Sequence, residues 1–250
     1  MSKRARKIVK TIDRLTDYGM LLFFIPFILI GLYSAYDAYM LYAETTNDSI
    51  LRHKPGYESD VPDDGKEIQG RMVAWITLDD TKVDYPVMQG KDNSEYVNKN
   101  PYGEFSFSGS VFLDARNSAD FTDRYNLLYG HHMEHDLMFG VLDRYLKEDF
   151  FKSHQDGTLI VGNEEFKFRL FCVLETDATN REIFDPTRAG SNEDFIEYAR
   201  KNSAFYDEKS EARDDERLIA LTTCKFPNTS ERTVVIGAIE PAKERKGEER

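Results

Sequence analysis

The sequence has very little cysteine: its 250 residues include only Cys172 and Cys224, beside a single tryptophan. Neither cysteine lies in a Cys-x-x-Cys motif or a Cys/His pair with the spacing of a structural zinc site, so we expect no such metal centre. Two cysteines in an exported protein can form a disulfide. The alternative is that one of them is a reactive thiol.

The chain also lacks an excess of positive charge. Its formal net charge is −12, although residues 1–17 carry a net +4 on their own, so the remaining residues are more acidic still. Nucleic-acid binding requires a basic face, and the composition argues against that class of function.

One long stretch lacks charged residues altogether. Residues 20–35 read MLLFFIPFILIGLYSA, and the wider segment 18–42 can span a hydrocarbon core of about 30 Å as a helix. A cleaved signal peptide is the alternative, but no clear Ala-x-Ala site follows the apolar stretch. The basic residues before the helix place the N-terminus in the cytoplasm. We therefore predict a cell-membrane protein with a cytoplasmic tail over 1–17, a single-pass anchor over 18–42 and an extracellular C-terminal domain.

The rest of the chain has the pattern of a β protein. Residues 43–68 are polar and predict a stalk with a short helix near 47–53. Between 69 and 240 one run, 166–175, alternates clearly between apolar and polar residues. Further short strands are predicted at 72–78, 82–88, 110–114, 126–129, 158–161, 217–223 and 233–239.

Two helical segments interrupt these strands. Residues 138–151 have apolar residues at helical spacing, and a second helix is predicted over 192–205 with Ser191 as its N-cap. About eight short strands with two helical inserts predict a mainly β fold, a closed or nearly closed β-barrel. A charged tail, 241–250, ends the chain.

Three polar residues lie at the ends of predicted strands. Cys224 ends the run LIALTTC, His131 follows NLLYG, and Arg232 begins the next strand. A thiol needs a neighbouring base to become an efficient nucleophile, and a guanidinium can stabilise an oxyanion. Each residue also has an ordinary explanation, because cysteines are usually buried and an arginine on a strand is usually solvated. A catalytic Cys224 would exclude a disulfide with Cys172.

These motifs occur in an order that resembles the sortase family. The resemblance covers roughly residues 70–240, and the stretches 86–90, 93–98, 109–114 and 138–140 are similar to class B sortases in particular. The motifs that carry it are Tyr129-Gly130-His131-His132-Met133, Leu221-Thr222-Thr223-Cys224 and Arg232-Thr233-Val234-Val235.

The resemblance implies the closed eight-stranded sortase barrel, with Cys224 as the nucleophile, His131 as the catalytic histidine and Arg232 as the residue that positions substrate and oxyanion. It implies substrate-binding residues at Asn93, Val97, Tyr129, Ile183, Phe184, Thr222 and Thr223.

The implied function is that of a membrane-anchored cysteine transpeptidase. Such an enzyme cleaves a C-terminal sorting motif of a surface protein or pilin and joins the acyl group to an amine of a peptidoglycan precursor or pilin. It requires no metal or cofactor. Two alternatives use the same sequence: a cysteine endopeptidase that releases its product to water, and a non-catalytic anchored binding barrel.

Overall fold

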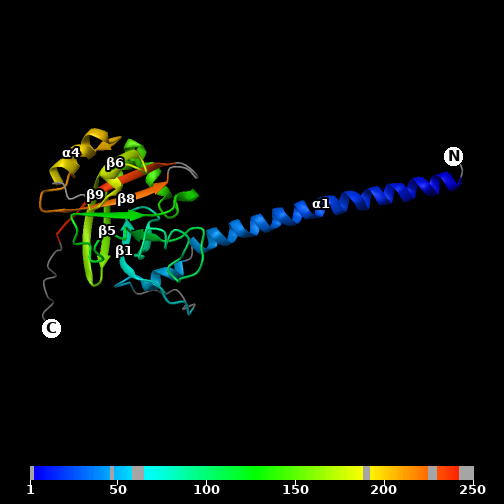
Figure 1. Ribbon diagram of the computed structural model, residues 1–250, viewed down its shortest axis with the longest axis horizontal. Coiled ribbons are helices and arrows are strands. Elements are labelled where there is room, and N and C mark those ends of the chain that lie inside the picture. The colour runs from blue at the N-terminus through cyan, green and yellow to red at the C-terminus, as the bar shows by residue number, and fades with distance from the viewer. Residues whose placement is uncertain (1–2, 46–47, 58–64, 188–191, 225–229, 242–250) are drawn as a thin grey trace. The chain divides into compact units, whose positions relative to one another are not determined.

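The computed structural model describes residues 3–45, 48–57, 65–187, 192–224 and 230–241 (Figure 1). The chain divides into two compact units, Met1–Thr46 and Asn47–Arg250, which are considered separately below.

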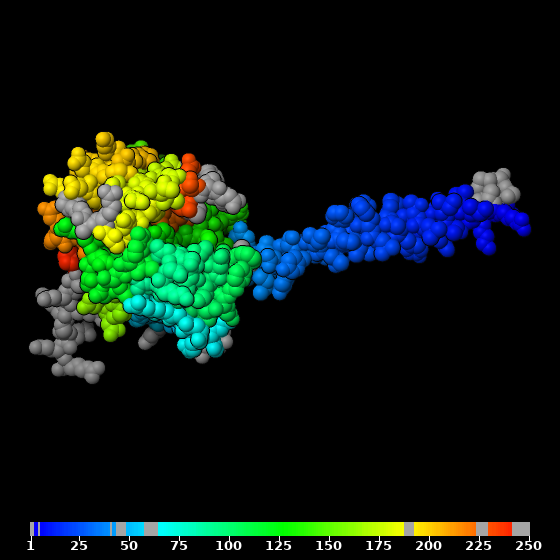
Figure 2. All heavy atoms as spheres, viewed as in Figure 1, coloured from blue at the N-terminus to red at the C-terminus, as the bar shows by residue number. Residues whose placement is uncertain are grey.

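The first unit is one continuous helix, α1 (Lys3–Thr45), which contains Pro26. Its large apolar side chains are exposed from Ile8 to Met40. Figure 2 shows the atoms of this helix in blue. The segment Arg6–Met40 is long and apolar enough to cross a membrane by length and composition. The helix begins at Lys3, so the basic residues that we predicted as a separate tail are themselves helical.

The second unit is built on a closed β-barrel, which confirms the predicted fold. Eight strands follow one another in the order β5-β1-β2-β3-β4-β8-β9-β6, and pairing of β5 with β6 closes the ring. Most neighbours are antiparallel, but β2–β3 and β4–β8 are parallel. The described strands are β1 (Met72–Leu78), β2 (Asp84–Met88), β3 (Val111–Leu113), β4 (Tyr125–Tyr129), β5 (Asp156–Val161), β6 (Glu164–Asp177), β7 (Phe205–Tyr206), β8 (Arg217–Cys224) and β9 (Glu231–Ile239).

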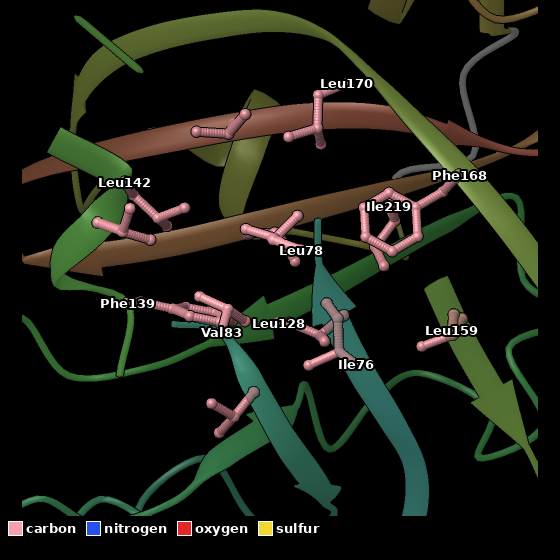
Figure 3. Close-up of a cluster of buried hydrophobic side chains, with 14 of the residues drawn as sticks. Ile76, Leu78, Val83, Leu128, Phe139, Leu142, Leu159, Phe168, Leu170 and Ile219 are labelled. Atoms are coloured by element: carbon pink, nitrogen blue, oxygen red, sulfur yellow. The ribbon is translucent and has the colours of Figure 1, made fainter. Parts of the chain in front are cut away.

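The barrel interior is the main hydrophobic core. Alternate residues of each strand point inward, as for Ile76 and Leu78 of β1 and Ile219 of β8 (Figure 3). Phe139 and Leu142 reach the same core from outside the sheet. Each such side chain contributes about 1.5–3 kcal/mol when it is fully buried, so the alternation fixes the register of every strand.

The outer face of β8 and β9 is buried under a second cluster of apolar side chains. Ala220 and Val234 of the strands belong to this cluster together with Ile183, and α4 (Asn192–Asn202) adds Ile196 and Ala199. Figure 1 shows α4 beside β6, which it contacts. Both faces of these central strands are therefore covered, which explains why β8 reads as a nearly continuous apolar run.

The helical segments differ from the prediction in detail. Residues 138–151 do not form one helix: the 3-10 helix η3 (Gly140–Leu146) is separated from α2 (Glu148–Ser153) by Lys147, whose backbone is extended. A Cβ on Gly140 would lie 1.9 Å from the carbonyl oxygen of Met133, so the chain passes too close to itself there for another residue.

The second predicted helix stops at Asn202 because Phe205 pairs with Val173 of β6 as part of the two-residue strand β7. Its predicted N-cap, Ser191, lies outside the described residues. The described residues also include three short helices: η1 (Asp48–His53), where a short helix is predicted, η2 (Glu134–Asp136), and α3 (Arg181–Phe184), which the sequence does not predict.

Candidate active site

The three candidate catalytic positions meet at one edge of the barrel. Strand β8 lies between β4 and β9, and it runs parallel to β4 and antiparallel to β9. The ends of β4 and β8 and the beginning of β9 therefore lie at the same edge. Cys224 is the last residue of β8, and its Cα is paired with that of Arg232. The side chain of Cys224 and residues 225–229 lie outside the part of the chain that the structure describes.

On the other side of β8, the hydrogen bonds between β8 and β4 lead to His131. Tyr129 is paired with Thr222, and the amide of Gly130 donates to the carbonyl oxygen of Thr222 at 3.1 Å. His131 follows directly, one step beyond this bond. The fold thus brings a histidine and an arginine to the two flanks of the strand that ends in Cys224, although 93 residues separate His131 from Cys224 in the sequence.

His131 is oriented by a backbone carbonyl. Its Nε2 lies 2.6 Å from the carbonyl oxygen of Val97. A carbonyl oxygen can only accept, so Nε2 carries the hydrogen and Nδ1 is the nitrogen that can exchange a proton. The resemblance implies Val97 as a substrate-binding residue, and in the structure its backbone carbonyl also orients His131.

His132 has a different environment. Its Nε2 lies 3.0 Å from Oδ2 of Asp143, and Oδ1 of Asp143 accepts a hydrogen bond of 2.5 Å from the hydroxyl of Thr233. These three residues, which we call the Asp143 link, connect the segment after β4, helix η3 and the beginning of β9. Sequence reasoning missed Asp143, because its partners come from distant parts of the chain.

Arg232 is half-buried at the beginning of β9, where it is paired with Thr176 of β6 as well as with Cys224. Its Nη1 donates to the carbonyl oxygen of Glu231 at 3.1 Å. Next to it, hydrogen bonds from Ser230 and Thr179, together with the charge of Arg232, lower the pKa of Asp177 to about 2. The carboxylate of Asp177, whose charge interacts with that of Arg232, is therefore ionised at every physiological pH.

Two of the predicted substrate-binding residues hold the same buried carboxylate. Asn93 donates through Nδ2 to Oδ2 of Asp114 at 2.8 Å, and the hydroxyl of Tyr129 donates to the same oxygen at 3.0 Å. Arg116 donates to Oδ1 through Nε at 2.8 Å and to Oδ2 through Nη2 at 2.7 Å. We call these four residues the Asp114 cluster. The side chain of Asp114 is fully buried.

The charge of this cluster is set by its hydrogen bonds. Burial opposes ionisation of Asp114, but the hydrogen bonds from Arg116 and Asn93 outweigh it and lower the pKa of Asp114. Burial, with the charge of Asp114 next, raises the pKa of Tyr129, which therefore remains a neutral donor.

The remaining predicted substrate residues are more deeply placed. The side chain of Ile183 is fully buried in the outer cluster, whereas its neighbour Phe184 is only partly buried. Thr222 and Thr223 are also buried. Neither hydroxyl has a hydrogen-bond partner among the residues that the structure describes.

Comparison with known proteins identifies the family. The family model of the sortase domain matches residues 76–240. This chain belongs to the sortase family.

Its relatives place this sortase in class B. It is 32% identical over 181 residues to sortase B of Listeria monocytogenes, covering 72% of this chain and 73% of that protein. Sortase B of Staphylococcus aureus is 30% identical over 179 residues, covering 70% and 72%.

Solved structures agree. A crystal structure of a Streptococcus pyogenes class B sortase involved in pilus biogenesis is 38% identical, with a TM-score of 0.64, and the match covers 69% of this chain and 94% of that one. A Staphylococcus aureus sortase B–substrate complex is 28% identical, also with a TM-score of 0.64, over 69% and 81%. Sortases are cysteine transpeptidases, and the chain is therefore an enzyme of that class.

The second cysteine of this sortase has no feature of a nucleophile. Cys172 is a free, fully buried thiol in the middle of β6, 3.9 Å from the carbonyl oxygen of Ala199. Burial raises the pKa of the Cys172 thiol to about 12. It is therefore unreactive at neutral pH, as expected from its place on the apolar face of its strand.

Proposed function

We propose that this sortase is a membrane-anchored transpeptidase that cleaves a C-terminal sorting motif and transfers the acyl group to an amine at the cell surface. The observation that carries the proposal is the strand register, in which Cys224 is flanked by Arg232 on β9 and by the segment that leads to His131 after β4. A nucleophile, an acid–base group and an oxyanion stabiliser from three neighbouring strands are the set that acyl transfer requires.

The proposed reaction has two steps. The thiolate of Cys224 attacks a peptide carbonyl, and Arg232 stabilises the oxyanion of the tetrahedral intermediate. His131, as the imidazolium that has taken up the thiol proton of Cys224 on Nδ1, donates this proton to the leaving amine, while its Nε2 remains bonded to Val97. The C–N bond breaks, and a thioester joins the substrate to Cys224.

In the second step an acceptor amine loses a proton to His131 and attacks the thioester. The C–S bond breaks, a new amide forms, and the thiolate of Cys224 is regenerated. The acceptor in this proposal is an amine of a peptidoglycan precursor or of a pilin lysine.

We propose that the sorting peptide binds beside this edge of the barrel. Asn93, Tyr129 and Phe184 would contact it, with Val97, Thr222 and Thr223 around the reacting bond and Ile183 supporting Phe184 from beneath. Two relatives support a peptide substrate: one was solved as a substrate complex, and another is involved in pilus biogenesis.

We also propose the orientation in the membrane. The segment 18–42 of α1 would cross the bilayer, with the basic residues of 1–17 in the cytoplasm by the positive-inside rule. Residues 43–68 would connect the anchor to an extracellular catalytic domain over 69–240. The proposed charged tail, 241–250, lies almost entirely outside the described residues.

A peptide-library assay tests this function. The full-length chain in detergent is incubated with a library of short peptides, with and without oligoglycine or lysine peptides as amines, and the products are analysed by mass spectrometry. We expect new amide products that depend on the amine and disappear in Cys224→Ala.

Cys172→Ala is the matched control, and it should retain activity because Cys172 lies in the core. Cleavage that persists in Cys224→Ala would refute the assignment of the nucleophile. Cleavage that never incorporates an amine would favour the endopeptidase alternative instead.

A further inference from the structure

Arg116 connects parts of the chain that are distant in sequence. Its Nη2 donates both to Oδ2 of Asp114 and to the carbonyl oxygen of Phe184, each at 2.7 Å. Its Nη1 lies 3.4 Å from Oδ1 of Asp185. One guanidinium therefore joins the loop after β3 to the end of α3, which lies 68 residues further along the chain.

The carboxylate of Asp114, which accepts from Arg116, is itself held by two other residues. The carboxylate of Asp114 accepts from Asn93 after β2 and from Tyr129 at the end of β4, in addition to Arg116. Asp114 thus holds Arg116 on one side and two proposed peptide-binding residues on the other. Removal of Arg116 would leave a fully buried carboxylate without its counter-charge, a costly arrangement.

Helix α3 depends on such contacts. It has only four residues, far fewer than an isolated helix needs to be stable in water. The hydroxyl of Tyr125 donates to the carbonyl oxygen of Ile183 at 3.0 Å, and Arg116 holds that of Phe184. Two tertiary hydrogen bonds therefore fix the C-terminal end of α3 against the barrel.

We propose that Arg116 is a positioning residue for substrate specificity: it fixes Phe184 at a set separation from Asn93 and Tyr129, and this separation determines which sorting peptides bind. The inference rests on the proposed function, because those three residues are its proposed peptide contacts. Neither Asp114 nor Arg116 was singled out by its residue type or spacing in the sequence.

The geometry requires arginine and not merely positive charge. A guanidinium presents several N–H donors in a rigid plane, so one group can serve both Asp114 and the carbonyl of Phe184. A lysine at the same position would keep the charge beside Asp114, but its single ammonium group could not donate to Asp114 and to the carbonyl of Phe184 in the same geometry. Arg116→Lys is therefore the informative variant, because it separates positioning from charge neutralisation.

Arg169 provides a matched control. Its Nη1 and Nη2 donate to Glu216 at 3.1 and 2.7 Å, and the side chain of Glu216 is fully buried, like that of Asp114. Arg169 is paired with Ala238, near the end of β9 that is remote from Arg232. Arg169→Lys perturbs a comparable ion pair at the opposite end of the barrel.

The kinetic test uses the full-length chain in detergent and fluorogenic forms of the peptides that the wild type cleaves in the library assay. We expect Arg116→Lys to raise KM by about tenfold, the effect of one charge-assisted hydrogen bond, with kcat within about twofold of the wild type. Discrimination between the preferred peptide and the next best one should also decrease. Arg169→Lys should leave KM and discrimination unchanged. Equal kinetics in the two variants, or a lower kcat at unchanged KM, would overturn the inference.

Hydrogen exchange tests the same inference without a substrate. The amides of Ile183 and Phe184 donate to the carbonyl oxygen of Asn180, at 3.3 and 2.9 Å, and they report on α3 directly. Exchange over residues 181–184 should become at least about fivefold faster in Arg116→Lys and stay unchanged in Arg169→Lys.

Unchanged exchange over 181–184 in Arg116→Lys, or equally faster exchange throughout β8 and β9, would overturn the positioning role. A wild type that cleaves no library peptide would refute the proposed function, and the exchange result would still decide whether Arg116 fixes α3.

Discussion

The Asp143 link makes a quantitative prediction about the stability of the active-site edge. In Asp143→Ala the hydroxyl of Thr233, a fully buried residue, loses its partner. An unsatisfied buried polar group costs about 1–3 kcal/mol, and the partly exposed contact with His132 adds less than about 1 kcal/mol. We therefore expect the free energy of unfolding to fall by about 2–3 kcal/mol, which corresponds to a decrease in Tm of about 4–12 °C for a domain of this size.

The Thr233→Val variant separates these contributions. It removes the hydroxyl and leaves Asp143, which is partly exposed, open to water. We expect a cost of less than about 1 kcal/mol, because a hydrated carboxylate incurs no penalty of burial. The double variant should cost about 1 kcal/mol, so the coupling energy between the two positions is about 1–3 kcal/mol in magnitude.

The assay is urea unfolding of the full-length chain in detergent, followed by tryptophan fluorescence. Trp75 is the single tryptophan and is fully buried in β1, so its emission reports on the barrel. Asp136→Asn is the control, since Asp136 pairs with Arg144 at 2.8 Å on the surface and should contribute under about 1 kcal/mol, and asparagine tolerates the positive φ of 61° at this position. Additive effects of Asp143→Ala and Thr233→Val would refute the reasoning, because they would show that the two groups do not stabilise each other.

Three further predictions concern single residues. A methanethiosulfonate reagent at pH 8 should label Cys224 and not Cys172 in the folded chain; with its pKa at about 12, only about one part in 10⁴ of the Cys172 thiol is ionised at that pH. Labelling of Cys172 in Cys224→Ala at a comparable rate, detected by mass spectrometry, would contradict its burial. His131→Ala should lower kcat by at least about 10²-fold, and His132→Ala by less than about tenfold, because His132 contacts Asp143 and not Val97; equal losses in steady-state assays would invalidate the choice between them. Since the pKa of Asp114 is lowered in the folded chain, its ionisation stabilises the fold above the ordinary aspartate pKa of about 3.9, and this contribution is lost as the pH falls through the lowered value. The difference in unfolding free energy between wild type and Asp114→Asn should thus be constant from pH 7 to about 5 and shrink at pH 3, and a difference that persists at pH 3 would contradict this account.

Much of the barrel could be predicted from local patterns. The alternation of apolar and polar residues predicted a strand at 166–175, and β6 occupies Glu164–Asp177. Strand alternation is a local property, because the period of two follows from the geometry of the extended backbone. The closure of the ring could not be read in the same way, since pairing of β5 with β6 and of β4 with β8 joins residues that no local pattern connects.

The helical inserts show where local patterns fail. Residues 138–151 have helical spacing of apolar residues, yet Lys147 is extended and divides the segment. Apolar residues from both parts, such as Leu142 and Phe151, reach the same core. Burial of both sets is satisfied by the broken helix, and the spacing alone does not distinguish the two arrangements.

For the active site, the sequence by itself determined which residues are candidates: Cys224, His131 and Arg232 occur at strand ends in an order that resembles the sortases. Local sequence is sufficient for this because a nucleophile, a base and a guanidinium are recognised by their chemistry. Only the tertiary structure decided what surrounds them. It assigned Nε2 of His131 to the carbonyl of Val97 and His132 to Asp143, and it placed Arg116 between Asp114 and Phe184. Apart from the local pair of Arg116 and Asp114, these contacts join residues that lie between 11 and 68 positions apart along the chain, so they form only in the tertiary structure.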